Sequence, residues 1–294
     1  MGDRAELPKV SVVIPAYNEE AAIGETIEVI RRVMEASRYP FEILVVNDGS
    51  KDRTEEIARQ HGARVINHHE NKGVGWARKT GIRAAEGEII VMMDGDGTYP
   101  AEQIPELLSY MDRCDMCVGD RSREAGTMKL LRVPAKWIIR HIASYVTGKK
   151  IYDLNSGLRA FYKDTVLQYF NILPGGHSWV STQTIAYLAS GLTVKYTPID
   201  YHPRKGKSSF HPLSDTLQYL SLVFRAVMYF NPLKVFIPLA LVFFGGGVAK
   251  LLWEGPLIKH GPIKESTIIL ITFGGLVGVI GLLADLIVKM NRPS

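Results

Sequence analysis

The chain has 294 residues and a formal net charge of +5, and its composition is 46% hydrophobic and 22% charged. It is longer than one typical domain, and its apolar content permits a well-packed core. The basic balance fits either a nucleic-acid partner or basic segments beside a membrane, and two long apolar stretches near the C-terminus exclude the nucleic-acid alternative.

The first part of the chain alternates predicted strands and helices. A β-branched strand runs from Lys9 to Pro15, and the three-to-four spacing of Ile23, Ile27, Ile30 and Met34 then predicts a helix. The alternation continues with strands over residues 41–46 and 64–66, helices over residues 54–61 and 74–85, and a strand that begins at residue 89. This order predicts an α/β fold, Rossmann-like, with a mostly parallel sheet and helices on both faces.

Polar turns follow three of the predicted strands. They read Pro15-Ala16-Tyr17-Asn18-Glu19, Asn47-Asp48-Gly49-Ser50 and Asp94-Gly95-Asp96. In such sheets ligands bind beyond the carboxyl ends of the strands, so we expect these turns to converge on one binding site. The sequence has neither a Gly-x-x-x-x-Gly-Lys-Ser/Thr loop nor a Gly-x-Gly-x-x-Gly turn after the first strand, which excludes a P-loop and a dinucleotide site.

The third turn ends an apolar run, Ile89 to Met93, in two carboxylates. If the strand continues through the turn, Asp94 and Asp96 project to the same side of the sheet. Gly95 and Gly97 would let a bulky anionic group approach the backbone closely. Carboxylate oxygens suit Mg²⁺ or Mn²⁺, which complete their shell with substrate phosphates and water. The turn therefore predicts a metal site for a diphosphate substrate, and the alternative is a loop that only turns the chain.

Two stretches after the sheet are amphipathic. Residues 130–146 and 215–230 each present an apolar face that includes an aromatic residue, Trp137 or Phe224, beside basic residues. This pattern is typical of a helix that lies among lipid headgroups. We expect interfacial helices over residues 129–148 and 213–231, and the alternative is an amphipathic helix packed on the sheet.

Two apolar runs, Leu233 to Trp253 and Thr267 to Val288, are each long enough to cross a bilayer as a helix. The N-terminus, Met-Gly-Asp-Arg, lacks the apolar core of a signal peptide. We therefore expect a two-span membrane protein with both termini in the cytoplasm. The predicted divisions are a catalytic domain over residues 1–212, a juxtamembrane helix over 213–231 and the spans over 232–290.

Small and charged residues within the spans lead to two further expectations. The small-residue faces, Gly245-Gly246-Gly247 and Gly274 with Gly278, permit close packing of the two spans or of a homo-oligomer. Asp285 would be costly against lipid, and Lys289 four residues later is its expected partner.

The three turns, in this order and spacing, resemble those of the family 2 glycosyltransferases of the GT-A fold, and the resemblance extends to about residue 210. Within that family the chain is most similar to the dolichyl-phosphate mannose synthases and the bacterial polyisoprenyl-phosphate glycosyltransferases. The segments that carry this closer resemblance are Gly119-Asp120-Arg121, Asn155-Ser156-Gly157-Leu158-Arg159 and residues 204–209.

The resemblance implies roles for individual residues. Those that would bind the nucleotide sugar are Pro15, Tyr17, Glu19, Val46, Asp48, Asp94, Gly95, Asp96 and Arg204. Asp94 and Asp96 would also hold Mg²⁺ or Mn²⁺, and Arg121, Lys207 and Ser208 would bind the acceptor phosphate. Asp94, Asp96 and Arg121 are the expected catalytic residues.

The chain departs from the family pattern at three places. Many relatives have Asp where this chain has Asn47, and Gln where it has Thr98, which removes one expected metal ligand. The family's Arg-x-x-Gly-x-Ser-Lys appears here as Arg204-Lys205-Gly206-Lys207-Ser208-Ser209, one residue tighter and without the final Lys. Lys207 is its expected substitute.

The segment His177 to Gln183 contains no Asp or Glu, although relatives that act on sugar hydroxyls have a catalytic carboxylate there. A hydroxyl needs a general base, whereas a phosphate monoester is already an anion at neutral pH. We therefore expect transfer of a hexose from a nucleotide diphosphate sugar, of the GDP-mannose or UDP-glucose type, to a polyisoprenyl phosphate. The rivals are a transferase with a hydroxyl acceptor and a non-catalytic membrane scaffold or flippase partner.

Two pairs of residues with metal-binding chemistry have simpler interpretations. His68 and His69 are adjacent on an extended segment and cannot share an ion, which favours a solvated loop. Cys114 and Cys117 have no second pair with which to complete a zinc site, and we expect two reduced structural thiols.

Overall fold

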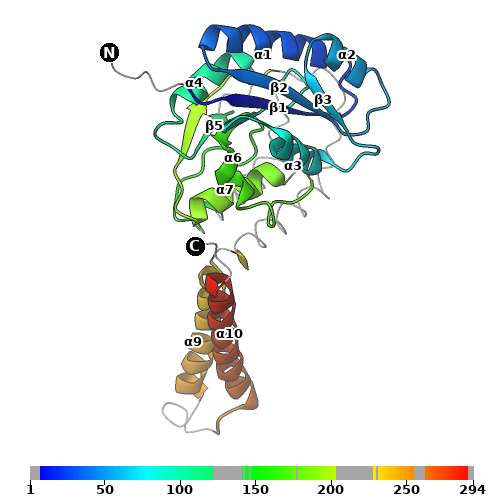
Figure 1. Cartoon of the computed structure of the whole chain (residues 1–294). Helices are drawn as coiled ribbons and strands as arrows, with labels where there is room; N and C mark the ends of the chain where they lie inside the picture. Colours follow the sequence, from blue (N-terminus) through cyan, green and yellow to red (C-terminus); the bar gives the residue numbers. More distant parts are fainter. Residues whose placement is uncertain are drawn as a thin grey trace, which may run out of the picture. The chain divides into compact units, whose positions relative to one another are not determined.

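The structure is a computed structural model that describes residues 7–121, 141, 143–145, 147–176, 178–202, 228–229, 231–254 and 262–290. The chain divides into two compact units, Met1–Leu222 and Val223–Ser294. The first contains an α/β sheet and the second a helical hairpin (Figure 1). The expected interfacial helices at 129–148 and 213–231 lie largely outside the described residues.

The first unit is built on a seven-stranded sheet in the order β3-β2-β1-β4-β6-β5-β7. The strands are β1 (Val10–Ala16), β2 (Phe41–Asn47), β3 (Arg64–Asn67), β4 (Ile89–Met92), β5 (Met116–Asp120), β6 (Arg159–Tyr162) and β7 (Val194–Pro198). Only β6 is antiparallel to its neighbours, so the prediction of a mostly parallel sheet is confirmed. The first three predicted strands agree with the structure to within one residue at each end.

Helices cover both faces of this sheet, as predicted (Figure 1). One face carries α1 (Ile23–Ser37), α2 (Thr54–Gln60), η1 (Ala101–Gln103) and α4 (Ile104–Ser109), and the other carries α3 (Val74–Ala84), α6 (Lys163–Leu167) and α7 (Trp179–Ala189). Alternate residues of β1 point to opposite faces of the sheet: Val12 packs with α1, and Val13 packs with Ile82 of α3. The four apolar residues that predicted α1 are all fully buried against the sheet.

The direction of the strands determines where the polar turns lie. Because β1, β2, β4, β5 and β7 are parallel, their carboxyl ends share one edge of the sheet. The antiparallel β6 brings its amino end to the same edge, where Arg159 pairs with Met92. The turns at this edge comprise residues 17–22, 48–53, 93–100, 121, 153–158 and 199–202, and we call them the rim. The three polar turns therefore lie at one edge of the sheet, as predicted.

The second unit consists of α9 (Leu233–Glu254) and α10 (Glu265–Met290). Both are long and apolar enough to cross a membrane, and they coincide with the two predicted spans. Most of their large apolar side chains are exposed, which is unlike the core helices of a soluble protein. Asp285 pairs with Lys289 at 2.8 Å, as the sequence predicted.

Glycines bring the two helices of the hairpin close together. A Cβ on Gly274 would collide with the backbone of Phe244, and one on Gly281 would lie 2.5 Å from Phe236 Cβ. In contrast, a Cβ on Gly275 would meet nothing within 4 Å. Part of the small-residue face is therefore used for packing of the two spans within one chain.

We expect Gly274→Ala to destabilise the hairpin by roughly 1–3 kcal/mol, because the new methyl group must push two backbones apart. Gly275→Ala is a matched control on the same turn of helix, and its open surroundings predict no loss. The measurement is the loss of helical circular dichroism on denaturant titration of the full chain in detergent. Equal midpoints for the two variants would contradict the packing.

Candidate active site

The turns after β1 and β2 hold each other in place through side chains. Asn18 has a left-handed backbone with φ of 54°, and its N–H donates to Ser50 Oγ at 2.9 Å. Its Oδ1 accepts from the Lys51 N–H at 2.8 Å, and the Glu19 N–H donates to Thr54 Oγ1 at 2.8 Å. These hydrogen bonds between the two turns hold Tyr17 at the rim, where 41% of its surface is exposed. Pro15 and Val46 pair with each other directly below, in β1 and β2.

Asp48 is buried in the second turn, and several groups bind its carboxylate. The N–H groups of Lys72 and Gly73 donate to it at 3.0 and 2.8 Å. His68 Nδ1 lies 2.6 Å from Asp48 Oδ1, and its Nε2 lies 2.9 Å from Thr80 Oγ1. The interpretation of His68 as part of a solvated loop is therefore wrong, because its side chain is 8% exposed and links Asp48 to α3.

The Asp94–Asp96 turn differs from its predicted form. β4 ends at Met92, so the two carboxylates lie in a turn and the argument from strand alternation is wrong. The Asp94 side chain is 33% exposed, whereas Asp96 is buried. Thr98 donates to Asp96 Oδ1 from its N–H at 3.1 Å and from its Oγ1 at 2.6 Å. Thr98 therefore fixes the orientation of the Asp96 carboxylate through two hydrogen bonds to one of its oxygens.

Arg78 of α3 contacts the candidate site and was not predicted from the sequence. Its Nη2 donates to Asp94 Oδ1 at 2.9 Å, and its guanidinium lies 5.8 Å from the centre of the Trp179 ring. Its Nε and Nη1 are buried without a hydrogen-bond partner among the described residues. An arginine midway between Val74 and Ile82, on the buried stripe of an amphipathic helix, is the signal that could have identified it.

Arg121 lies at the end of β5 in a cage of polar and aromatic side chains. Its Nε and Nη2 donate to the two oxygens of Asp153 at 2.8 and 3.1 Å. Its guanidinium lies 5.3 Å from the centre of the Tyr201 ring, which meets Tyr99 edge-on at 5.1 Å. Burial alone would raise the pKa of Asp153, but Arg121 and backbone N–H donors outweigh it and lower that pKa. The guanidinium is thus held in one orientation before any ligand binds.

Arg159, at the start of β6, joins the 153–158 turn to α7. It donates to the carbonyl oxygen of Ser156, and its Nη1 donates to Val180 O at 2.9 Å and to Gln183 Oε1 at 3.0 Å. Burial and the charge of Arg78 lower the pKa of Arg159 to about 10. In the same region Gly157 lies against Asp94, because a Cβ on Gly157 would be 2.6 Å from Asp94 Oδ2.

The carboxylates of the rim fit one kind of metal ion. Within the described residues, no three His, Cys, Asp or Glu side chains are grouped to hold a metal. Asp94 and Asp96 offer two carboxylates separated by one residue, Gly95, and Arg78 already binds one oxygen of Asp94. This donor set fits Mg²⁺ or Mn²⁺, which bind through one or two carboxylates and add substrate phosphates. It does not fit a structural zinc site.

Other predicted residues have a different status. The candidates Arg204, Lys207 and Ser208, and also His177, lie outside the described residues. Cys114 and Cys117 are buried and free, as expected of reduced structural thiols. Asp153 and Tyr201, which position Arg121, were not predicted, since Asp153 is 32 residues from its partner in sequence.

The sheet order, the acidic rim and the C-terminal hairpin define the chain as a glycosyltransferase of the GT-A fold. Residues 11–170 match the model of glycosyl transferase family 2, and residues 231–290 match that of the GtrB C-terminal hairpin. The chain belongs to glycosyl transferase family 2, which confirms the family and the enzyme class that the turns predicted.

Curated relatives of the chain include two hexose transferases of Haloferax volcanii. The chain is 33% identical over 208 residues to a dolichyl-phosphate hexose transferase, covering 70% of this chain and 88% of that protein. It is 32% identical over 214 residues to the low-salt glycan biosynthesis hexosyltransferase Agl6. That alignment covers 71% of this chain but spans only 51% of Agl6, about half its length.

Among solved structures, the fold is similar to that of glucosyl-3-phosphoglycerate synthase from Mycobacterium tuberculosis. The TM-score is 0.60 at 21% identity, over 75% of this chain and 80% of that one. That enzyme was solved in complex with Mn²⁺, UDP and glucosyl-3-phosphoglycerate. At this identity the similarity shows the fold.

Proposed function

We propose that the chain transfers a hexose from a nucleoside diphosphate sugar to a polyisoprenyl phosphate at the cytoplasmic face of a membrane. The observation that carries the proposal is Arg121, a cation held ready by Asp153 at the same rim as the Asp94–Asp96 turn. A phosphate acceptor needs such a cation to bind it. The dolichyl-phosphate hexose transferase similar to this chain supports the same reaction.

The carboxylates of the rim support a phosphate acceptor over a hydroxyl acceptor. The first turn of α7 contains no acidic residue. Asp94 and Asp153 are each paired with an arginine, and the low pKa of Asp153 makes it a weak base. A phosphate monoester needs no base, because it is already an anion. The same charged cluster argues against a non-catalytic scaffold, which would have no use for it.

Five residues of the rim, and Arg78 beside it, then have proposed roles. Asp94 and Asp96 would hold Mg²⁺ or Mn²⁺, which would offset charge on the leaving nucleoside diphosphate. Tyr17 and Asp48 would bind and orient the nucleotide, and Arg121 would place the acceptor phosphate for in-line attack. Arg78 would hold Asp94 in one orientation through the hydrogen bond to its Oδ1. The hairpin would anchor the enzyme beside its lipid substrate.

The test varies the charge of the acceptor. We expect the purified chain, with Mg²⁺ or Mn²⁺ and a panel of nucleoside diphosphate sugars, to glycosylate a short polyprenyl monophosphate. The matched polyprenol with a free hydroxyl should react at least about a hundredfold more slowly, because it lacks the anion that Arg121 binds. Products are separated by thin-layer chromatography and identified by mass spectrometry.

Two results would contradict the proposal in different ways. Use of the alcohol or of a soluble sugar, with the monophosphate ignored, would favour the hydroxyl-acceptor rival. Failure of the chain to bind any nucleoside diphosphate sugar would favour the scaffold.

A further inference from the structure

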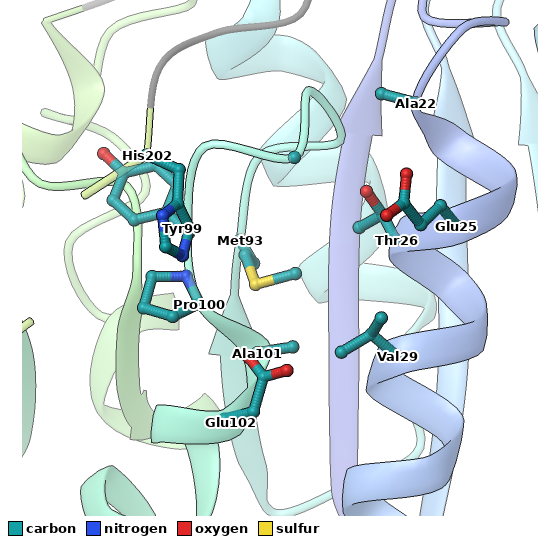
Figure 2. A pocket seen from close by; sticks show the side chains of 11 residues that line it. Ala22, Glu25, Thr26, Val29, Met93, Tyr99, Pro100, Ala101, Glu102 and His202 are labelled. Carbon is teal, nitrogen blue, oxygen red and sulfur yellow. The ribbon is translucent and has the colours of Figure 1, made fainter. Parts of the chain in front are cut away.

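Tyr99 occupies a position between the Asp94–Asp96 turn and Arg121 that the proposed roles leave unexplained. Its ring lines a cavity of about 180 Å³ between α1 and the 97–102 segment, together with Thr26 and Met93. Figure 2 shows that the Tyr99 hydroxyl points away from this cavity. The ring is almost completely buried, with 6% of its residue surface exposed, so the direction of the hydroxyl is fixed by packing.

The hydroxyl end of Tyr99 adjoins Asp94. The Gly157 N–H donates to Tyr99 Oη at 2.7 Å. A Cβ on the same glycine would lie 2.6 Å from Asp94 Oδ2 and 3.1 Å from Tyr99 Cε2. The carboxylate and the edge of the phenol therefore meet over one glycine, where only a residue without a side chain fits.

Tyr99 also adjoins the Arg121 cage. Its ring meets the Tyr201 ring edge-on at 5.1 Å, and the Arg121 guanidinium lies 5.3 Å from the centre of the Tyr201 ring. Tyr99 is thus within reach of two groups that the proposed function places on opposite sides of the reaction. Asp94 belongs to the donor and its metal ion, and Arg121 belongs to the acceptor.

The hydrogen bonding of the Tyr99 hydroxyl is incomplete. Because its oxygen accepts from the Gly157 N–H, the phenol still has its own proton to donate. No acceptor for that proton is present among the residues that the structure describes. A phenol keeps its proton at neutral pH. A buried donor without an acceptor is costly unless a ligand supplies one.

We propose that Tyr99 donates this hydrogen bond to a phosphate oxygen of a bound substrate, at the junction between Asp94 and Arg121. The inference deepens the proposed function and rests on it for the identity of the substrates. The oxygen belongs either to the acceptor monophosphate or to the donor diphosphate. A phenol that bonds an anion acts as the donors of an oxyanion hole do, without giving up its proton.

The first test compares Tyr99→Phe with Tyr162→Phe. The first change removes the hydroxyl and keeps the ring. The second removes a tyrosine hydroxyl that donates to Met111 O at 2.5 Å, on a residue that pairs with Ile89 at the opposite end of β4 from the rim. We expect Tyr99→Phe to lower kcat/KM for transfer by about tenfold to a hundredfold and Tyr162→Phe to leave it within twofold.

Donor binding in the absence of lipid distinguishes the two sources of phosphate. If Tyr99 bonds the acceptor, calorimetry will give the same Kd for the nucleoside diphosphate sugar in wild type and in Tyr99→Phe. If it bonds the donor diphosphate, that Kd will rise together with the Kd of the free nucleoside diphosphate. Transfer and binding by Tyr99→Phe that both match Tyr162→Phe would overturn the inference.

A second measurement does not depend on turnover. 3-Fluorotyrosine at position 99 can still accept the hydrogen bond of the Gly157 N–H and donate the proposed one to phosphate. Its fluorine resonance should shift when a phosphate oxygen binds the phenol. We expect a shift on addition of nucleoside diphosphate with Mg²⁺ or of short polyprenyl phosphate, and none with polyprenol. If neither phosphate ligand moves the resonance, Tyr99 does not contact phosphate, whatever the activity of the chain. If a phosphate ligand moves it but no lipid is glycosylated, the inference stands and the proposed acceptor is wrong.

Discussion

Replacement of Asp94 by asparagine is expected to lower kcat/KM for sugar transfer by roughly a thousandfold. Asparagine keeps an oxygen that can accept the hydrogen bond of Arg78, now 2.9 Å from Asp94 Oδ1. It removes the negative charge that would bind the metal ion. Loss of the ion pair leaves the buried Arg78 guanidinium without its counter-charge and should lower the unfolding free energy by roughly 3–5 kcal/mol, so circular dichroism must show that the variant is folded.

The measurement combines transfer rates with Mn²⁺ binding, followed by electron paramagnetic resonance in the presence of nucleoside diphosphate. We expect Asp94→Asn to lose Mn²⁺ affinity along with activity. Asp112→Asn is the matched control, because Asp112 is exposed and, among the described residues, forms an ion pair only with the neighbouring Arg113. Transfer that persists in excess chelator would show that no divalent ion acts at Asp94 and Asp96.

The fold was largely predictable because each element carries a local signal. The spacing of Ile23, Ile27, Ile30 and Met34 predicts α1, and all four are fully buried. Carboxyl ends of parallel strands must meet at one edge, so the convergence of Tyr17, Asp48 and Asp94 follows from strand order. What could not be predicted was the end of β4 at Met92, because Met93 continues the apolar run that the strand begins.

The contacts within the site were less predictable, because they join residues that are distant in sequence. Arg78 and Asp94 are 16 positions apart, and Arg121 and Asp153 are 32 apart. No periodicity relates such pairs. His68 was misread for a different reason: the argument that it cannot share a metal with its neighbour says nothing about a hydrogen bond to Asp48. A buried charge is destabilising without a partner, and only the folded structure shows which residue lies close enough to be that partner.

Variants of the Arg121–Asp153 pair are expected to lose both stability and activity. A double-mutant cycle separates the contribution of the pair to the unfolding free energy from its contribution to catalysis. The two side chains are 15% and 12% exposed, so removing one charge leaves the other buried without its partner. We expect Arg121→Gln and Asp153→Asn each to lower the unfolding free energy by roughly 3–5 kcal/mol. The double variant should be more stable than the sum of the two losses predicts, because neither charge remains.

Stability of the wild-type chain should depend on pH through the same pair. The pKa of Asp153 is lowered in the folded chain, so the unfolded chain binds a proton more readily. The contribution of the pair is therefore complete above about pH 4 and is lost as the pH falls through the lower, folded-state value. Denaturant titrations from neutral pH into acid should show a steeper loss in wild type than in the double variant. Equal slopes would contradict the ion pair.

The order of the variants in kcat/KM should differ from their order in unfolding free energy. Every variant without Arg121 should lose at least about a hundredfold in kcat/KM for polyprenyl phosphate, including the double variant whose stability partly recovers. Asp153→Asn keeps the guanidinium but loosens its orientation, and we expect a loss of about tenfold. Arg59→Gln, which breaks the exposed pair of Arg59 with Glu55 on α2, is the control for a surface ion pair and should change neither quantity measurably. If activity returned in the double variant together with stability, Arg121 would serve only the fold, and another group would have to bind the acceptor phosphate.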